Sequence, residues 1–355
     1  MRIYTEAYLD RNLGDDLMIR LMAKTFPEHD FYLYIDRGSN MIPFYDLENV
    51  HSTDVPFNKN FDTAQFEAVV IIGGSIFMLS RRLQAIERIR LKFPVLRKIR
   101  KAGLKLATIG CNLGPFRDKW CEKIACKQLA FSELATVRDQ KSLAIYQSYG
   151  NRAKMFPDML FSLEIPYVPP AHKDQVLGIS AYRSMFRGGV CMDYYEGMAN
   201  IADAYVNRTN GKIRLFAFDC EGENDIGAAY TIRRLMQNKK NCEIVVYDGD
   251  TDEFIQAFDG CSSLIATRFH SMVLAQVSGI PVLPVVYSNK MEDALDDLNY
   301  QGLRLIFGEP INDAEKVTDL LLERDQLFSL KKSQLEELKQ AADGHMESLR
   351  KYLEA

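Results

Sequence analysis

The chain has 355 residues, of which 47% are hydrophobic and 26% are charged, and its formal net charge at pH 7 is −4. This is the composition of an ordinary soluble protein, and the slightly acidic balance excludes a protein-wide basic field for nucleic acid. Because single cores rarely grow past about 250–300 residues, the length predicts two domains.

The N-terminus and the cysteines indicate a cytoplasmic protein. Residues 1–6 lead directly into a strand-like run rather than a secretory leader. No uncharged apolar run approaches the ~20 residues that span a bilayer. The seven cysteines are scattered and have no metal-binding spacing, so we expect reduced thiols and no metal site.

The first half of the chain alternates short apolar runs with helical patterns, which is typical of βαβ units around a parallel sheet. We expect strands over residues 1–7, 31–34, 68–72, 104–109 and 134–137. We expect helices over residues 14–25, 82–101 with a kink or break at Pro94, 118–131 and 141–149.

A proline-rich stretch over residues 165–170 reads as a linker, and the same rhythm then restarts. Strands are expected over residues 176–180, 213–218, 243–247, 263–266 and 282–286, with helices over 192–206, 227–238, 251–258 and 272–278. The pattern predicts an α/β protein of two Rossmann-like lobes, residues 1–165 and 172–312, with a central cleft.

Residues 313–355 form the predicted C-terminal helical tail, in two pieces, of which the second covers residues 323–353. Lys331, Lys332 and Lys339 lie on this amphipathic tail. A solvated helix face explains them, and so does a peripheral contact with anionic lipid at the inner face of the membrane. Both interpretations stay open, and the oligomeric state is not indicated by the sequence.

The loop after the first strand holds Asn12, Gly14, Asp15 and Asp16. Gly14 allows a tight turn or a close approach to a ligand. One of the two aspartates is enough to cap the helix that follows, so the other is a candidate for orienting or deprotonating a substrate hydroxyl.

Two further glycine-bearing loops follow strands of the first lobe, Gly73-Gly74-Ser75 and residues 110–115. Their backbone N–H groups can hold an anion or a sugar hydroxyl, although tight turns after buried strands explain them almost as well. Arg138 and Asp158 also follow apolar runs. A surface ion pair and an Asx turn are the alternatives to a role in a site.

In the second lobe, Arg183 falls just past a strand. The acidic loop at residues 219–225 holds four carboxylates, but its spacing differs from an EF-hand, which favours a solvated loop that caps the next helix. The strongest signal is Arg268, His270 and Ser271 at a strand-to-helix turn. An arginine beside a helix N-terminus suits an anion, and the chain has only five histidines.

The sequence resembles the polysaccharide pyruvyl transferase family over nearly its whole length. The resemblance is carried by a series of short motifs in a specific order: Asn12-Leu13-Gly14-Asp15-Asp16, Gly73-Gly74-Ser75, Gly110 to Gly114-Pro115, Val137-Arg138-Asp139, Pro157-Asp158, Gly178-Ile179-Ser180, Thr267-Arg268-Phe269-His270-Ser271, Gly279-Ile280-Pro281 and Tyr287-Ser288-Asn289-Lys290.

The resemblance implies a GT-B-like fold, phosphoenolpyruvate as the donor substrate, and a sugar acceptor on a cell-surface glycan or a lipid-linked oligosaccharide. No separate cofactor and no nucleic acid are implied. It implies that Arg268 and Arg183 hold the donor and that His270 is the catalytic acid. The remaining candidate site residues are Asn12, Gly14, Asp15, Asp16, Gly73, Gly74, Ser75, Arg138, Ser271 and Lys290.

Two other functions remain open on the same architecture. A glycosyltransferase that uses a nucleotide sugar would hold a diphosphate on the basic and glycine-bearing loops. A non-catalytic glycan-binding protein would bind sugar without releasing phosphate.

Overall fold

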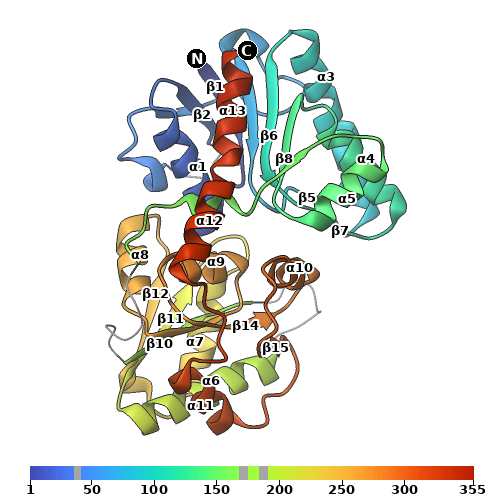
Figure 1. Ribbon diagram of the computed structural model, residues 1–355. Coiled ribbons are helices and arrows are strands. Elements are labelled where there is room, and N and C mark those ends of the chain that lie inside the picture. The colour runs from blue at the N-terminus through green and yellow to red at the C-terminus, as the bar shows by residue number, and fades with distance from the viewer. Residues whose placement is uncertain (36–40, 168–174, 184–190) are drawn as a thin grey trace. The chain divides into compact units, whose positions relative to one another are not determined.

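A computed structural model describes residues 1–35, 41–167, 175–183 and 191–355, apart from the side chains of residues 289 and 290. Close packing divides the chain into two units. The first comprises residues 1–9, 15–162 and 337–355, and the second comprises residues 10–14 and 163–336. Both units are α/β, with helices packed against a parallel sheet (Figure 1).

The sheet of the first unit has the strand order β3-β2-β1-β4-β6-β8-β9. The strands are parallel, with these bounds: β1 Arg2–Glu6, β2 Asp30–Tyr34, β3 Val50–Thr53, β4 Ala68–Ile72, β6 Lys105–Cys111, β8 Leu134–Val137 and β9 Lys154–Met155. A separate short ribbon pairs β5 (Phe77–Leu79) with β7 (Leu113–Phe116).

The sheet of the second unit has the order β12-β11-β10-β13-β14-β15. Its parallel strands are β10 Val176–Ser180, β11 Lys212–Ala217, β12 Cys242–Val246, β13 Ser263–Ala266, β14 Val282–Val286 and β15 Leu305–Ile306. In both sheets the chain enters at a central strand, adds strands on one side, and then crosses to the other side. This is the doubly wound order, in which ligands bind where the direction reverses.

The helices cover the two sheets and share their cores. In the first unit they are α1 Leu13–Thr25, α2 Arg82–Glu87, α3 Phe93–Lys101, α4 Lys119–Leu129, α5 Gln140–Ser148 and α13 Gly344–Glu354. The second unit is covered by α6 Met192–Thr209, α7 Asp225–Leu235, α8 Thr251–Asp259, α9 Phe269–Val277, α10 Asn289–Asp297 and α11 Ala314–Glu323, and α12 Lys332–Ala342 continues the chain. Within the described ranges, none of the helices combines the length and the apolar character needed to cross a bilayer.

The expected helix over residues 82–101 is interrupted, because Pro94 cannot donate a backbone hydrogen bond. It occupies the first turn of α3, and the residues before it, Arg88–Lys92, form a π-helical segment. The expected linker lies only partly in the described chain, since residues 168–170 fall outside it.

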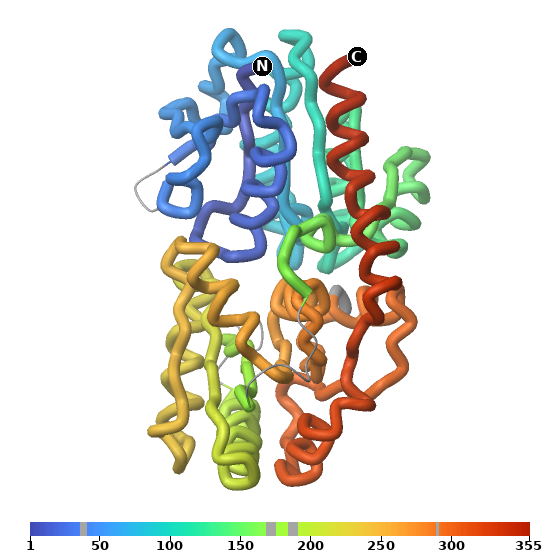
Figure 2. Tube along the Cα trace, turned by 60° about the vertical axis from the view of Figure 1, so that its left-hand side comes forward, coloured from blue at the N-terminus to red at the C-terminus, as the bar shows by residue number. Residues whose placement is uncertain are grey.

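The helical tail differs from its prediction. It forms three helices, and residues 324–331 are not helical because Phe328 exchanges backbone hydrogen bonds with Val282 at the start of β14. The tail is also not a separate body, since residues 337–355 pack with the first unit and the preceding part packs with the second. Figure 2 follows α13 to the C-terminus, which lies in the same unit as the N-terminus.

His345 fixes α13 to the strand ends of the first unit. The hydroxyl of Thr136 on β8 accepts from the Gly110 N–H at 2.9 Å and lies 2.7 Å from Nδ1 of His345. Nε2 of His345 then donates to the Pro157 carbonyl at 2.9 Å. Burial lowers the pKa of His345 to about 4, so the ring is neutral with its proton on Nε2, and Nδ1 accepts from the Thr136 hydroxyl.

We predict that this histidine makes the first unit sensitive to acid. In the unfolded chain the His345 ring is protonated near pH 6.5, whereas in the folded chain it is protonated only near pH 4. Stability is therefore lost as the pH falls through this window, by roughly 3 kcal/mol in total. Replacing His345→Gln removes the titration, so the gap in unfolding free energy between wild type and variant should shrink between pH 7 and pH 4.5 in urea titrations.

His51→Gln provides the control, because that ring is part-exposed at the edge of the sheet. A wild type and a His345→Gln variant whose stabilities fall in parallel across the window would contradict the neutral, buried ring.

Candidate functional site

The candidate site of the second unit lies where its sheet reverses the strand order. Strands β10 and β13 are neighbours there, and the chain leaves them through Ala181–Arg183 and Thr267–Arg268. The carboxyl ends of parallel strands meet at one edge of a sheet, which explains why residues more than eighty positions apart gather here. The backbone N–H of Arg268 donates to the hydroxyl of Ser180 at 3.2 Å and joins the two strand ends.

Arg268 is buried, and its guanidinium is held by two carboxylates. Nε and Nη2 donate to the two oxygens of Asp225 at 2.8 and 2.6 Å, and Nη1 donates to Glu223. The ring of Tyr182 lies under the guanidinium, 4.7 Å from its carbon. Burial alone would lower the pKa of Arg268, but the carboxylates of Asp225 and Glu223 raise it well above its ordinary value. The arginine is therefore a permanent cation whose charge is already more than offset by two carboxylates.

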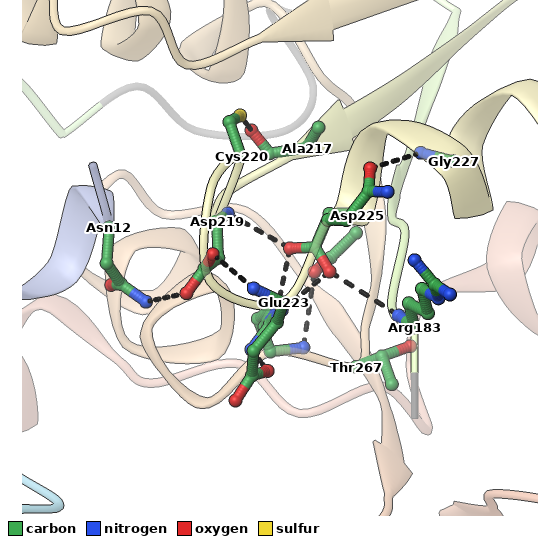
Figure 3. A network of polar contacts seen from close by, with 12 residues as sticks. Asn12, Arg183, Ala217, Asp219, Cys220, Glu223, Asp225, Gly227 and Thr267 are labelled. Carbon is green, nitrogen blue, oxygen red and sulfur yellow. Dashed lines mark hydrogen bonds and ion pairs between the residues drawn. The ribbon is translucent and has the colours of Figure 1, made fainter. Parts of the chain in front are cut away.

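The two carboxylates differ in how firmly they are fixed. Asp225 lies in the first turn of α7 with a side chain that is 0% exposed, whereas the side chain of Glu223 is 30% exposed. Asp225 also accepts from the backbone N–H of Asp219 at 3.0 Å and of Arg183 at 3.4 Å (Figure 3). Asp225 is thus a built-in counterion, and Glu223 is the part-exposed partner.

The acidic loop is only partly the solvated, helix-capping loop that its composition suggested, since Glu221, Gly222 and Asn224 are exposed but two of its carboxylates are not. Asp219 and Asp225 are buried, and Asp219 accepts from the Glu223 N–H at 2.8 Å, so the loop is closed by its own backbone. Asn224 caps α7 by accepting from Gly227. Burial and pairing with Arg268 explain the carboxylates, and in the described part of the chain no three potential ligands are grouped to hold a metal ion.

Asn12 and Gly14 pack with the second unit, although the sequence placed them in the first lobe. The Asn12 amide donates to Asp219 at 3.1 Å and accepts from the Gly14 N–H at 3.1 Å, and the Leu13 N–H donates to the Phe218 carbonyl. These bonds fasten a short segment of the N-terminal region to the end of β11 (Figure 3). Composition does not predict that this segment packs with the second unit, because the packing depends on backbone pairing between residues distant in the sequence.

His270 stands in the first turn of α9 and is half-buried. Its ring lies against the backbone of Gly14, where a Cβ would be 1.7 Å from Nδ1. Gly14 is therefore required by the close approach of an imidazole. Ser271 next to it is buried, and its hydroxyl donates to the Arg268 carbonyl at 2.6 Å, which stabilises the turn. A contact of Ser271 with substrate stays a prediction.

The first unit gathers a second group of the predicted residues at its own strand ends. Arg138, after β8, donates to Asp158 at 2.6 Å and to the Asn112 side chain at 2.8 Å. The side chains of this ion pair are only 2% and 3% exposed. The guanidinium also lies against Gly74, where a Cβ would come within 2.4 Å of it. The pair is thus a buried junction of three loops and not a surface pair.

The reversal point of the first sheet lies between β1 and β4. Asp15 lies there against Gly73, with a carboxylate oxygen 3.2 Å from where a Cβ would be, and it is half-buried. Asp16 is 1% exposed, whereas Ser75 is exposed. Of the two aspartates, only Asp15 has a partly accessible side chain. Arg183 is exposed, and the side chain of Lys290 lies outside the described part of the structure.

The sequence does not predict the residues that hold the two buried arginines. Asp225 and Glu223 lie in a loop whose composition indicates solvation, and nothing in the sequence connects Asn112 or Asp158 with Arg138. Both arginines directly follow apolar runs, which indicates burial, and a buried arginine needs a carboxylate partner. The sequence does not show which carboxylate is the partner.

The family model of the polysaccharide pyruvyl transferases matches residues 12–289. The chain belongs to this family. The matched region begins at Asn12 and ends beside Lys290, so it includes both strand-end groups. Among curated proteins, none matches the chain.

Solved structures of similar fold include enzymes that handle nucleotide sugars. UDP-GlcNAc 2-epimerase from Neisseria meningitidis, bound to UDP-GlcNAc, has a TM-score of 0.59 at 10% identity and covers 99% of this chain and 100% of its own. The enzyme of that name from Methanocaldococcus jannaschii has a TM-score of 0.58 at 7% identity, covering 99% of each chain.

Anabaena HepE, in complex with UDP and glucose, has a TM-score of 0.56 at 12% identity and covers 99% of this chain and 98% of its own. At these identities the likeness concerns the fold alone. It confirms the predicted GT-B fold of two Rossmann-like lobes for this family member.

We predict that the two carboxylates of Arg268 contribute unequally to stability. Asp225→Asn leaves a buried guanidinium without its bidentate partner and should cost about 3–5 kcal/mol. Glu223→Gln, which removes a part-exposed partner, should cost less than about 1 kcal/mol. Urea unfolding of the two variants, read against wild type, measures the difference. Similar losses for both would show that Asp225 is not the built-in counterion.

Proposed function

We propose that the protein transfers pyruvate from phosphoenolpyruvate to a sugar residue of a cell-surface polysaccharide or its lipid-linked precursor, and that the product is a cyclic pyruvate ketal. The observation that carries the proposal is the placement of Arg268 and His270 at the reversal point of the second sheet, in a member of this family. No cofactor beyond the donor substrate is part of the proposal.

The donor carries a carboxylate and a phosphate, so it needs more than one cationic or N–H partner. In the proposal, Arg268 and Arg183 bind these groups together with the backbone N–H groups at the start of α9. In the structure, Arg268 with Asp225 and Glu223 carries a net charge of −1. Donor binding therefore requires the part-exposed Glu223 to leave, and it transfers Nη1 of Arg268 from a carboxylate to the incoming anion.

His270 acts as the acid. It gives its proton to the methylene carbon of phosphoenolpyruvate, which becomes a methyl group, and the central carbon becomes cationic. A sugar hydroxyl forms a bond to that carbon, and the carbon–oxygen bond to phosphate breaks with its electron pair. A second hydroxyl then closes the ketal. Of the two hydroxyl protons released, one restores His270 and the other leaves on phosphate.

The acceptor is assigned to the first unit. Asp15 has the partly accessible carboxylate that is needed to orient or deprotonate a hydroxyl, and it lies against the Gly73-Gly74 turn. Ser75 is exposed beside this turn and offers a further hydrogen bond. Arg138 is fully enclosed by Asp158 and Asn112, so we assign it to positioning the loops rather than touching the sugar.

The proposal is tested by phosphate release from phosphoenolpyruvate with a panel of galactosyl, glucosyl and N-acetylmannosaminyl acceptors. Wild type should release phosphate in step with acceptor consumption. His270→Gln should keep the fold and lower turnover about 10²–10⁴-fold, because the proton to the methylene carbon is lost.

Two outcomes would overturn this function. Transfer from UDP-glucose or UDP-GlcNAc without phosphate release from phosphoenolpyruvate would indicate a glycosyltransferase. Acceptor binding without any turnover would indicate a non-catalytic glycan-binding protein.

Gly14 gives a sharper test of His270, because it alters the imidazole without replacing it. A methyl group at Gly14 collides with the ring and forces it to turn. Gly14→Ala should therefore lower turnover about 10²-fold or more, while circular dichroism should show that the fold is kept. The double variant with His270→Gln should be no slower than His270→Gln alone, as expected for two changes that remove one function.

Gly227→Ala is the matched control. This glycine also lies in the first turn of a helix of the second unit, but a Cβ there meets only ordinary contacts at 3.5–3.7 Å. Two results would contradict the assignment of His270 as the acid. They are unchanged turnover in Gly14→Ala, and a loss of turnover in the double variant equal to the product of the two single losses.

A further inference from the structure

A strongly basic segment of the first unit also exposes apolar side chains. Residues 81–101 contain nine Lys or Arg residues and one Glu, a net charge of +8 in a chain whose total is −4. The segment comprises α2, the π-helical residues Arg88–Lys92 and α3. Charge of one sign is thus concentrated on a single helical stretch.

The inner side of this stretch is an ordinary helix–core contact. Ala85 and Phe93 pack into one apolar core, and Val95, Leu96 and Ile99 pack into another. Arg88 and Lys92 also turn inward, to the Ile76 carbonyl and to Glu6. These contacts fix the helices against the unit, so the remaining side chains of the stretch form a defined outer surface.

That outer surface is not simply polar. Leu83 is 69% exposed, Leu91 is 57% exposed, and Ile86 and Ile89 are each 36% exposed. Leu83 and Ile86 are three residues apart and share a helix face. Single exposed apolar residues are normal on any protein, but four within nine residues are a cluster, and π-helical turns are often found at functional sites.

Helix α4 extends the same surface. Arg82 pairs with Asp118, the N-cap of α4, at 2.7 Å, which places Trp120 close to the start of α2. Trp120 is 38% exposed. The exposed cations of α4 are Lys119, Lys123 and Lys127. We use the name basic–apolar surface for the exposed residues of 81–101 together with Trp120 and these three lysines.

We propose that the basic–apolar surface docks on a membrane that contains anionic phospholipid. Lys and Arg attract the headgroups, and Leu, Ile and Trp insert between them, as in helices that lie in the plane of an interface. A nucleic acid or an acidic polysaccharide would use the cations but would leave the apolar side chains in water. The apolar cluster therefore selects a lipid surface as the partner.

This surface replaces the tail as the candidate for membrane contact. Helix α12, which carries Lys332 and Lys339, also carries Glu336 and Glu337, and its Leu335 is buried. It lacks the excess positive charge of the basic–apolar surface, and its apolar side chain faces the protein.

The test is co-sedimentation of the full chain with vesicles, which does not depend on the proposed activity. The protein should bind vesicles of phosphatidylcholine mixed with phosphatidylglycerol, bind phosphatidylcholine alone much more weakly, and release as salt is raised. The triple variant Leu83→Ser, Ile86→Ser, Leu91→Ser should bind at least about tenfold more weakly. Arg81→Gln, Arg90→Gln, Arg100→Gln should weaken binding by at least a similar factor.

Matched controls come from exposed residues of the second unit. Tyr230→Ser, Leu303→Ser, Ile306→Ser removes comparable apolar side chains, and Arg234→Gln, Lys239→Gln, Lys240→Gln removes comparable cations. Both should bind vesicles like wild type, and circular dichroism verifies the fold of every variant.

Three results would overturn the proposal. They are no binding to the anionic vesicles at low salt, binding that is unchanged in the Leu83, Ile86 and Leu91 variant, and tighter binding to a duplex oligonucleotide than to the vesicles. The last two would identify the surface as a general polyanion site.

Discussion

The interaction on which the second unit's site depends is the buried pair of Arg268 and Asp225. It joins the end of β13 to the first turn of α7, and the same carboxylate accepts N–H groups from Asp219 and Arg183. One aspartate thus fixes the loops that follow β10, β11 and β13. Isolated buried charges are expensive, so neither partner is tolerated without the other. The arrangement fixes a cation at the reversal point of the sheet, where a doubly wound fold binds its ligands.

The first unit reaches a similar solution with different residues. Arg138 is enclosed by Asp158 and Asn112 and lies against Gly74, so loops from three strand ends share one guanidinium. Here both side chains of the ion pair are almost inaccessible. Two buried arginines therefore have different capacities. The partner of Arg138 in its ion pair is buried, whereas Arg268 has one part-exposed partner, Glu223, which on the proposed function would exchange for the donor.

Much of the fold was predictable because the central strands of parallel sheets are continuous apolar runs. The strands over residues 68–72 and 176–180 were predicted at their observed bounds. Short edge strands such as β9 and β15, two residues each, carry too little pattern to be found. At the site, the predicted residues do follow strands, but their partners were not predictable. The pairings of Asp225 with Arg268 and of Asn12 with Asp219 join segments that are distant in the sequence, and motif spacing does not predict such contacts.

The neutralised state of Arg268 also bears on how a site of this kind discriminates among anions. A bare buried arginine would attract any small anion, including chloride or free phosphate. With Glu223 in place the site has a net negative charge, so a ligand gains only the difference between its own interactions and those of the carboxylate it displaces. On the proposed function, a monoanion that merely replaces Glu223 would gain little. A donor with both a carboxylate and a phosphate would replace Glu223 with one group and contact Arg183 or the N–H groups of α9 with the other. Competition with Glu223 would then favour ligands that carry two correctly spaced negative charges.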